Sequence, residues 1–538
     1  MQPYAVSYPA DYGKVSGKSY RLDIVLHGRD ASLTEVKFLY QHGAARAVPK
    51  EQEYVQLDIY GRGNNAYRWA GEEDVWEALA DFRATENALG RGDLLDPRRV
   101  VLRGFSMGGA GTWHLGLHHP DRFAVIGPGA GFTTTHGYIK DLPNPLPPHQ
   151  EACLHIYDAV DYTENARTVP IVAYSGEIDA QKAAADNIAR RLDELGIHSM
   201  THLIAPGLAH QFPVEWQKKA DIEWSKYAGP GKGRGADDTV SFVTYTLRYP
   251  SCVWIEIAGL EHHYQRASIE AKRAPNGLEI KTENVHSFRV RLPDQNRGLI
   301  GNVITIDGQP VDNALHVQKF DHLGYYVKQH GKWQTTIPPD AYPPDKRPLA
   351  KVPGLQGPID DAFTDGFICV VGTGKAWHEG TARFAEAQIE RFRREWDKYL
   401  RGALPVVTDK ELTEADIAHK HLILFGDPAS NSVLGTLIGK LPLKWSTDAL
   451  EFDHGRYDPA THVPVLIYPN PQNPTKYMVL NTGHTFHEAE LRGTNAQLYP
   501  RLGDYAILKP MPTKKDDAAY EIIRAGLFDE SWKIADRK

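Results

Sequence analysis

Cysteine is scarce in this sequence of 538 residues, which has only Cys153, Cys252 and Cys369, scattered and without a CxxC spacing. This scarcity excludes a disulfide framework and a zinc site built from cysteines. Basic residues are not in excess either, because 61 Lys and Arg stand against 68 Asp and Glu, a net charge of −7. The acidic residues are spread along the chain, so a nucleic-acid partner is not expected.

Long hydrophobic runs are also absent. No apolar run approaches the roughly 20 residues of a membrane-spanning helix, and we therefore expect no membrane partner. The N-terminal segment MQPYAVSYPADYGK lacks the basic start and the apolar stretch of a signal peptide. The compartment stays open: the protein is intracellular, or it is secreted or periplasmic if an N-terminal leader has been removed.

What is present is typical of a multidomain globular chain. Hydrophobic residues make up 41% and charged residues 24%, which is ordinary globular usage, and the length predicts two to four domains. Up to about residue 228, strand-like apolar runs alternate with helical patterns, which predicts an open, mostly parallel α/β sheet. The predicted strands are Tyr20–Leu26, Tyr54–Ile59, Arg99–Leu102, Ala124–Gly127, Pro170–Tyr174 and Thr201–Ile204, and the predicted helices are Asp74–Leu89, Gly109–His118 and Gln181–Leu195.

Two breaks in composition predict two further domains. Gly229–Gly235 has four glycines and one proline in seven residues, and the short β-rich runs that follow predict a small antiparallel β domain. A Pro-rich stretch, Pro338–Pro358, predicts a second linker, after which α/β alternation returns with the amphipathic helix Glu379–Leu400. We therefore predict an α/β domain over 1–228, an antiparallel β domain over 236–337 and a smaller C-terminal α/β domain over 350–538.

A candidate nucleophile lies in the segment Val100–Gly109. Here a predicted strand runs into Gly104-Phe-Ser106-Met-Gly108, and a predicted helix follows. This order of strand, sharp turn and helix is the context of the G-x-S-x-G nucleophile elbow. The two glycines are explained by sterics, because a side chain at either position would collide with neighbouring backbone around the strained serine.

An acid and a base are predicted downstream, each after a later strand. Asp179 ends the turn that follows the strand at Pro170, and His210 ends the turn that follows the strand at Thr201. His210 would take the proton of Ser106 as a general base, and Asp179 would orient the imidazole. Three other nearby carboxylates are alternatives to Asp179, namely Glu177 on the same turn and Asp158 and Asp161 before the strand.

Most of the 24 histidines are expected to be structural. We place His114, His118 and His119 on the surface and at the C-terminal end of a helix that Pro120 ends. His202 lies inside a predicted strand and is expected to pack there.

Acyl transfer also needs hydrogen-bond donors for the developing oxyanion. The backbone N–H of Met107, the residue after the nucleophile, is one donor by construction. The second is expected from the turn after the first predicted strand, where Gly28 permits the turn and the N–H of Arg29 is the candidate donor. His27 is expected to shape this loop rather than to react.

The loop Tyr60–Gly71 follows another strand and should emerge at the same edge of the sheet. Its polar and aromatic residues are candidates for substrate binding, with a surface loop that packs Trp69 as an equal alternative. Gly61-x-Gly63 lacks the third glycine and the immediate helix of a dinucleotide fingerprint, so no NAD and no other cofactor is expected. The candidate substrate-binding residues are Arg62, Asn64, Tyr67, Arg68 and Trp69.

Two weaker patterns lie in the predicted C-terminal domain. Val371–Lys375 resembles the end of a phosphate loop, but Ala376 replaces the required Ser or Thr and Cys369 stands where the first glycine belongs, so we interpret it as a strand-ending turn. His484-Thr-Phe-His-Glu488 has two imidazoles and a carboxylate but no third ligand, and we interpret it as structural rather than as a metal site.

Taken together, Gly104–Gly109, Asp179, the turn Gly207–His210 and the pair His27-Gly28 resemble an α/β-hydrolase. The resemblance covers about Tyr20–Lys226 and is to prolyl-oligopeptidase-type hydrolases and to the bacterial feruloyl and polyester esterases. A wider resemblance, to large bacterial multidomain hydrolases of the prolyl-oligopeptidase family, spans most of the chain. The resemblance implies two strands ahead of the strand that carries the oxyanion loop, and since 20 residues precede Arg21, we expect an abbreviated or trimmed N-terminus.

These observations predict a metal-independent serine hydrolase that cleaves carboxylic esters through an acyl-enzyme. Its substrate would be a small-molecule ester or an ester linked to a polymer. The preference for esters rests on the resemblance, because a dedicated peptidase of this type would carry a β-propeller ahead of the hydrolase domain. The alternatives are a serine peptidase with the same triad and a non-catalytic binding protein on a hydrolase fold.

Overall fold

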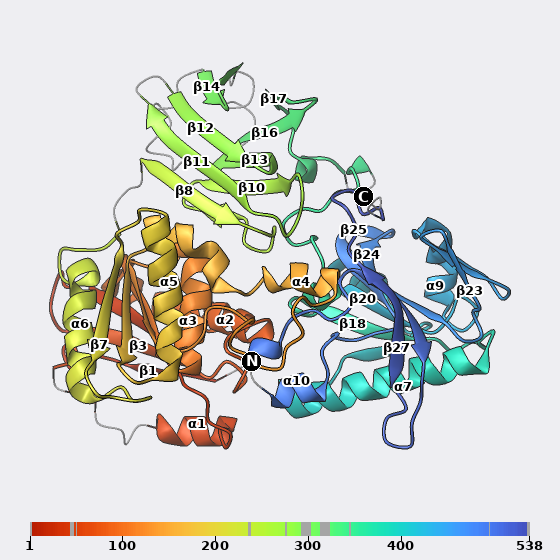
Figure 1. Cartoon of the computed structure of the whole chain (residues 1–538), viewed down its shortest axis with the longest axis horizontal. Helices are drawn as coiled ribbons and strands as arrows, with labels where there is room; N and C mark the ends of the chain where they lie inside the picture. The colour runs from red at the N-terminus through yellow and green to blue at the C-terminus, as the bar shows by residue number, and fades with distance from the viewer. Residues whose placement is uncertain are drawn as a thin grey trace.

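The strands form five sheets, which the computed structural model arranges in three lobes (Figure 1). The structure describes residues 3–43, 48–49, 51–234, 238–274, 277–291, 303–312, 323–343, 346–493 and 495–534. We call the lobe with strands β1–β7 the first lobe, that with β8–β17 the second and that with β18–β27 the third. Within these ranges no helix is both long and apolar enough to span a bilayer.

The first lobe is built on a seven-stranded sheet of order β1-β3-β2-β4-β5-β6-β7. Strand β1 pairs antiparallel with β3, and each of the other neighbours pairs in parallel. In such a sheet the strands from β2 onward end at one edge, where loops from different strands meet. The strands are β1 (Tyr4–Ser7), β2 (Tyr20–Leu26), β3 (Tyr54–Ile59), β4 (Leu95–Phe105), β5 (Val125–Gly129), β6 (Ile171–Gly176) and β7 (Met200–Ala205).

Helices cover both faces of this sheet, and the alternation of side chains along β4 shows how. Leu102 is part of the core that holds α2, α3 and α5, whereas its neighbour Val101 packs with Trp224 of α6 in a second core, because successive side chains of a strand point to opposite faces. The helices of this lobe are α1 (Glu35–Gln41), α2 (Ala70–Ala88), α3 (Met107–His118), α4 (Pro148–Leu154), α5 (Ala183–Glu194) and α6 (Val214–Ala228).

The second lobe has two five-stranded sheets, β17-β16-β13-β10-β9 and β15-β14-β12-β11-β8, with a core of their own. All pairings are antiparallel except that of β12 with β14. The strands are β8 (Thr239–Thr244), β9 (Ser251–Cys252), β10 (Ile255–Leu260), β11 (Ala267–Ala274), β12 (Gly277–Glu283), β13 (Val285–Arg291), β14 (Val303–Ile306), β15 (Gln309–Asp312), β16 (Leu323–Gln329) and β17 (Lys332–Thr335).

The third lobe has a second seven-stranded sheet, β19-β18-β20-β25-β24-β26-β27, and a small sheet of β21, β22 and β23. Strands β19, β18, β20 and β25 are parallel and the last three are antiparallel. The strands are β18 (Phe367–Val371), β19 (Val406–Thr408), β20 (His421–Phe425), β21 (Lys444–Trp445), β22 (Leu450–Phe452), β23 (Gly455–Tyr457), β24 (Val463–Asn470), β25 (Asn473–Leu480), β26 (Tyr505–Pro510) and β27 (Tyr520–Gly526), and the helices are α7 (Glu379–Glu395), α8 (Glu414–His419), α9 (Ser432–Leu437) and α10 (Glu488–Arg492).

The predicted fold class is confirmed, with additions. Strands β2 and β3 have the predicted bounds, whereas β1 and β11 were not predicted. Within the described residues one strand, Tyr4–Ser7, precedes β2, where the resemblance implied two. The three domain boundaries stay a prediction, and residues 236 and 538, at which two of them fall, lie outside the described residues.

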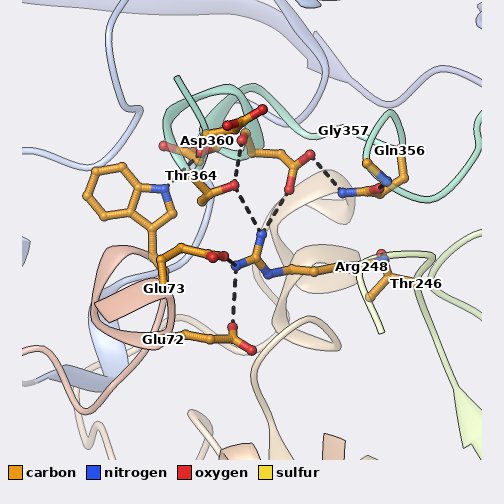
Figure 2. A network of polar contacts seen from close by, with 12 residues as sticks. Glu72, Glu73, Thr246, Arg248, Gln356, Gly357, Asp360 and Thr364 are labelled. Carbon is orange, nitrogen blue, oxygen red and sulfur yellow. Dashed lines mark hydrogen bonds and ion pairs between the residues drawn. The ribbon is translucent and has the colours of Figure 1, made fainter. Parts of the chain in front are cut away.

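One guanidinium joins all three lobes (Figure 2). Arg248 follows β8 and donates to Glu73 at 2.7 Å and to Glu72 at 3.3 Å, both in the first turn of α2. Its other terminal nitrogen donates to Asp361 of the third lobe at 3.0 Å. The buried apolar side chains of the first and third lobes also form one continuous cluster. Because breaking a buried ion pair costs about 3–5 kcal/mol, this contact holds the lobes in a fixed arrangement.

Candidate active site

Ser106 stands at the turn between β4 and α3 in a strained backbone conformation, with φ 60° and ψ −117°. A β-carbon at Gly104 would lie 2.5 Å from the carbonyl oxygen of Gly108, and one at Gly108 would lie 2.0 Å from that of Leu26. Both approaches are far below ordinary contact distance. The two glycines are therefore required by the tight crossing of the elbow over the end of β2.

The structure brings Ser106, His210 and Asp179 together, from the ends of three different strands. His210 Nε2 lies 2.8 Å from Ser106 Oγ, and His210 Nδ1 lies 2.8 Å from Asp179 Oδ2. The Asp179 side chain is 3% exposed and the His210 side chain 40% exposed. This chain of hydrogen bonds fits a nucleophile, a general base and an orienting acid, with the base open to solvent.

The alternative carboxylates are occupied elsewhere. Glu177 accepts a hydrogen bond from the backbone N–H of Gly207 at 2.7 Å. Asp158 accepts from the Thr135 backbone and side chain, and Asp161 pairs with His155 at 2.6 Å. Of the four carboxylates considered from the sequence, the structure brings Asp179 to His210.

Two residues that the sequence did not suggest contact Asp179 and His210. Gln181 donates its backbone N–H to Asp179 Oδ1 at 2.9 Å, while its side chain accepts from the N–H of Gly131 at 3.0 Å. The ring of Phe105 lies 4.7 Å from the imidazole of His210, centroid to centroid. An aspartate followed two residues later by a turn N–H is a common Asx arrangement, so the Gln181 contact had a local signal. The Phe105 contact crosses 105 residues of sequence and had none.

The predicted placement of two helix histidines was wrong. His114 and His118 are 2% and 0% exposed rather than on the surface, because every residue of α3 is buried. Burial lowers the pKa of His118 well below its usual value. Burial alone would raise the pKa of Glu72. The charge of Arg248 and the hydrogen bonds that Glu72 makes with His114 and His119 outweigh burial, so the pKa of Glu72 lies well below its usual value.

The candidate oxyanion donors flank the nucleophile. Met107 is the first residue of α3, and the first N–H groups of a helix have no partner within it. On the other side, a β-carbon at Gly28 would lie 3.6 Å from the β-carbon of Ser106, so the turn that carries the Arg29 N–H lies against the serine. The backbone at Gly28 and that at Met107 therefore both lie next to Ser106, and the role of the Met107 and Arg29 N–H groups stays a prediction.

The five residues proposed for substrate binding make contacts inside the protein. Arg62 donates to Asp74 and to the Leu400 carbonyl, and Arg68 is buried against Asp158. The other three also have internal partners: Asn64 bonds to Asp30, Tyr67 to His27 and Trp69 to Asp360. The alternative of a loop that packs Trp69 matches these contacts, and a substrate-facing role stays a prediction.

The weaker patterns of the third lobe also have internal contacts. Strand β18 ends at Val371, and the turn after it donates the Gly374 N–H to the Ser430 carbonyl at 2.8 Å. His484 is fully buried, and burial and Arg391 lower its pKa to about 3. Among the residues that the structure describes, no group of three or more His, Cys, Asp or Glu could hold a metal ion.

Comparisons with known proteins found one family match and several similar solved structures. Residues 48–225 match the family model described as prolyl oligopeptidase family. Similar solved structures include the fluorophosphonate-binding serine hydrolase F of Staphylococcus aureus (16% identity, 42% of this chain, 92% of that chain, TM-score 0.31), a ferulic acid esterase (16%, 42%, 90%, 0.29) and the acylaminoacyl peptidase of Pyrococcus horikoshii (14%, 41%, 39%, 0.31). A search of curated proteins found no match.

The matched segment lies within the first lobe, which has the fold of an α/β-hydrolase. Ser106, Asp179 and His210 lie inside the matched segment, whereas the oxyanion turn at Gly28 and the second and third lobes lie outside. The resemblance expected from the sequence is thereby confirmed for this serine hydrolase domain.

Proposed function

We propose that this hydrolase domain cleaves carboxylic esters through an acyl-enzyme on Ser106. The observation that carries the proposal is the pair of 2.8 Å hydrogen bonds from Ser106 through His210 to Asp179. A neutral hydroxyl is a weak nucleophile at pH 7, and a base within hydrogen-bond reach is what activates it.

In the proposed reaction His210 Nε2 takes the proton of Ser106 Oγ as this oxygen attacks the ester carbonyl carbon. The carbonyl oxygen becomes an oxyanion, which the N–H groups of Met107 and Arg29 bind. His210 then protonates the leaving alcohol as the C–O bond breaks, and water enters by the same route in reverse to release the acid. Asp179 holds the imidazole in position and stabilises its cation.

The exposure of the triad supports an ester substrate over a peptide. The His210 side chain is 40% exposed and Ser106 is half-buried, so an ester can approach whether it is small or attached to a polymer. A leaving alcohol also departs more easily than an amine, which lowers the demand on precise enclosure. Peptide hydrolysis with the same triad is the competing outcome of the test.

The first experiment is labelling with a fluorophosphonate, with Ser106→Ala as the test variant and Ser446→Ala, at an exposed serine of the third lobe, as the control. We expect labelling of the wild type and of Ser446→Ala but not of Ser106→Ala. Label that persists in Ser106→Ala would exclude this nucleophile. A wild type without label or turnover would favour a binding protein on a hydrolase fold.

The second experiment compares rates on matched nitrophenyl esters and peptide anilides. We expect kcat/KM for the best ester to exceed that for the best anilide. The reverse order would make the protein a serine peptidase with the same triad.

A further inference from the structure

The turn that carries the oxyanion donor is held by two side chains of the loop Tyr60–Gly71. Asn64 binds both backbone groups of Asp30: its Oδ1 accepts from the Asp30 N–H at 3.0 Å, and its Nδ2 donates to the Asp30 carbonyl at 2.8 Å. The hydroxyl of Tyr67 accepts from the His27 N–H at 2.7 Å. The two side chains therefore fix the residues on either side of Gly28 and Arg29.

The same turn also makes contacts through its own histidine and with the third lobe. The His27 ring contacts the Gly28 carbonyl at 2.7 Å and the Tyr60 carbonyl at 2.8 Å. The guanidinium of Arg29 donates to the carbonyl of Arg492, at the end of α10, at 3.3 Å. Since Gly28 lies against Ser106, any rotation of this turn moves the Arg29 N–H relative to the nucleophile.

The loop that provides Asn64 and Tyr67 is itself strained. Arg62, Ala66, Tyr67 and Trp69 all have φ between 52° and 55°, a left-handed conformation that costs a non-glycine residue free energy and persists only where the surroundings enforce it. Tyr67 is fully buried. The loop is thus a built support rather than a flexible surface segment.

The third lobe provides three of the contacts that hold this conformation, beside others within the first lobe such as that of Arg62 with Asp74. Arg62 donates to the carbonyl of Leu400 at 3.0 Å, and Arg68 donates to that of Ala496 at 3.2 Å. The indole of Trp69, which is 3% exposed, donates to the carbonyl of Asp360 at 2.8 Å. Contacts therefore run from the third lobe through this loop to the oxyanion turn and Ser106.

We propose that Asn64 and Tyr67 are positioning residues for the Arg29 oxyanion donor, and that the third lobe sets their geometry through Trp69. This inference rests on the proposed function, because it assigns the two side chains to the same acyl transfer. In this proposal the third lobe contributes to the reaction indirectly, because it keeps the Arg29 N–H aligned without touching the substrate.

The chain offers a matched control for Asn64. Asn284 in the second lobe makes the same pair of hydrogen bonds, with its Oδ1 accepting from the His262 N–H and its Nδ2 donating to the His262 carbonyl, both at 2.8 Å. Asn64→Ala and Asn284→Ala thus remove the same atoms and the same pair of hydrogen bonds. Asn284→Ala also removes a 3.2 Å hydrogen bond to the Gln265 carbonyl and places alanine at a φ of 54°, so it disturbs its own turn at least as strongly.

The test measures kcat and KM on one ester, and the inhibition constant of a trifluoromethyl ketone, whose serine adduct places an oxyanion between the donors. Loss of an oxyanion donor costs about 10²–10³ in kcat, so a displaced donor should cost about 10- to 100-fold. For Asn64→Ala we expect that fall in kcat, KM within threefold, and a rise in the inhibition constant that parallels the fall. Asn284→Ala should stay within twofold of the wild type on all three.

Tyr67→Phe is the second variant, because it removes one hydroxyl and keeps the buried ring. We expect its kcat to fall about tenfold with KM unchanged. The positioning role would be overturned by an unchanged kcat and inhibition constant in Asn64→Ala, or in Tyr67→Phe if Asn64→Ala does not fold. An equal fall of kcat in Asn284→Ala would overturn it as well. A wild type that hydrolyses no ester would overturn the proposed function and this inference together, which is a different result.

The contribution of the third lobe has its own matched pair. Trp69→Phe removes the indole N–H that donates to Asp360, while Trp224→Phe removes a buried indole N–H that has no hydrogen-bond partner among the described residues. We expect kcat to fall several-fold in Trp69→Phe, with the inhibition constant rising in step, and to stay within twofold in Trp224→Phe. Equal values in the two variants would overturn the link to the third lobe.

Discussion

The two seven-stranded sheets of this protein use the ends of their parallel strands in opposite ways. In the first lobe the residues after β4, β6 and β7 point their polar groups at one another, as Ser106, Asp179 and His210. In the third lobe the polar residues after β19 and β20 bind backbone instead. Asp409 accepts from the N–H groups of Thr373 and Ser432, and Asp427 accepts from that of Trp377.

The difference shows that topology alone does not make an active site. Loops gather at the same edge of both sheets, as in any parallel α/β layer. In the third lobe the carboxylates at this edge bind backbone N–H groups of the loops, whereas in the first lobe Ser106, Asp179 and His210 bind one another. The predictions that follow separate reactive from supporting polar groups, beginning with the largest effect.

The strongest test of the first sheet is Asp179→Asn. Because the amide cannot hold the imidazole in the reactive tautomer, we expect kcat on esters to fall by about 10⁴ with little change in KM. The control is Asp161→Asn, which removes the carboxylate of the His155–Asp161 pair and should leave kcat within twofold. Near-normal turnover by Asp179→Asn would move the acid to another carboxylate.

Gly108→Ala tests the packing of the elbow itself. Its β-carbon would lie 2.0 Å from the carbonyl oxygen of Leu26, so backbone must move, and we expect a loss of about 3 kcal/mol or more in the free energy of unfolding. Gly439→Ala in the third lobe meets no atom within 4 Å and should change stability by less than about 1 kcal/mol. Urea unfolding of the two variants measures the difference, and similar midpoints would contradict the steric explanation.

Asp427→Ala tests whether Asp427, which follows β20, stabilises the fold without taking part in the reaction. It removes the acceptor of three backbone N–H groups, those of Trp377, Ala429 and Ser430, and one unsatisfied buried donor costs about 1–3 kcal/mol. We expect a loss of roughly 3 kcal/mol in the free energy of unfolding with kcat on esters within twofold. Asp427→Asn keeps one acceptor oxygen and should lose less. A large fall in kcat at unchanged stability would place Asp427 in the reaction.

The smallest effect expected is a difference in how two aspartates, Asp74 and Asp409, make the free energy of unfolding depend on pH. Burial raises the pKa of Asp74 to about 7, even beside Arg62. The folded protein therefore binds more protons than the unfolded chain between about pH 4 and 7, and this group makes stability fall as the pH rises through that range. In Asp409 burial is outweighed by hydrogen bonds from Ser432 and Thr373, which lower the pKa, so its contribution is lost as the pH falls below about 4.

Melting temperatures from pH 3 to 8 distinguish the two. Asp74→Asn should flatten the decline between pH 4 and 7, by about 1.4 kcal/mol for each pH unit that separates the folded and unfolded pKa values. Asp409→Asn should flatten only the acid limb. Parallel profiles for both variants would contradict the assigned directions.

Local signals account for what the sequence predicted well. Strands β2 and β3 are continuous apolar runs, and their bounds match the prediction because both faces of a central parallel strand are buried. Strand β11 was missed because its buried residues include Ala267 and Ala271, which are too small to give a clear alternation. Strand β1 has four residues, and its partner β3 lies about 50 residues away.

The candidate site also combines residues that local patterns predict with contacts between distant segments. The elbow and the two downstream turns are local patterns, so Ser106, Asp179 and His210 could be chosen from spacing alone. The internal contacts of the loop Tyr60–Gly71 could not, because Trp69 meets Asp360 across 291 residues of sequence and Arg68 meets Ala496 across 428. No periodicity or turn rule carries information over such separations.

The Arg248 contact also decides how the chain can be divided in the laboratory. A fragment that ends at the glycine-rich linker near residue 228 would keep Glu72 and Glu73 but lose the guanidinium that neutralises them. It would also uncover the face of α3 that packs under Tyr249. An excised hydrolase domain therefore needs neutral replacements at both glutamates, because two carboxylates that the full chain pairs with a guanidinium would be left without it.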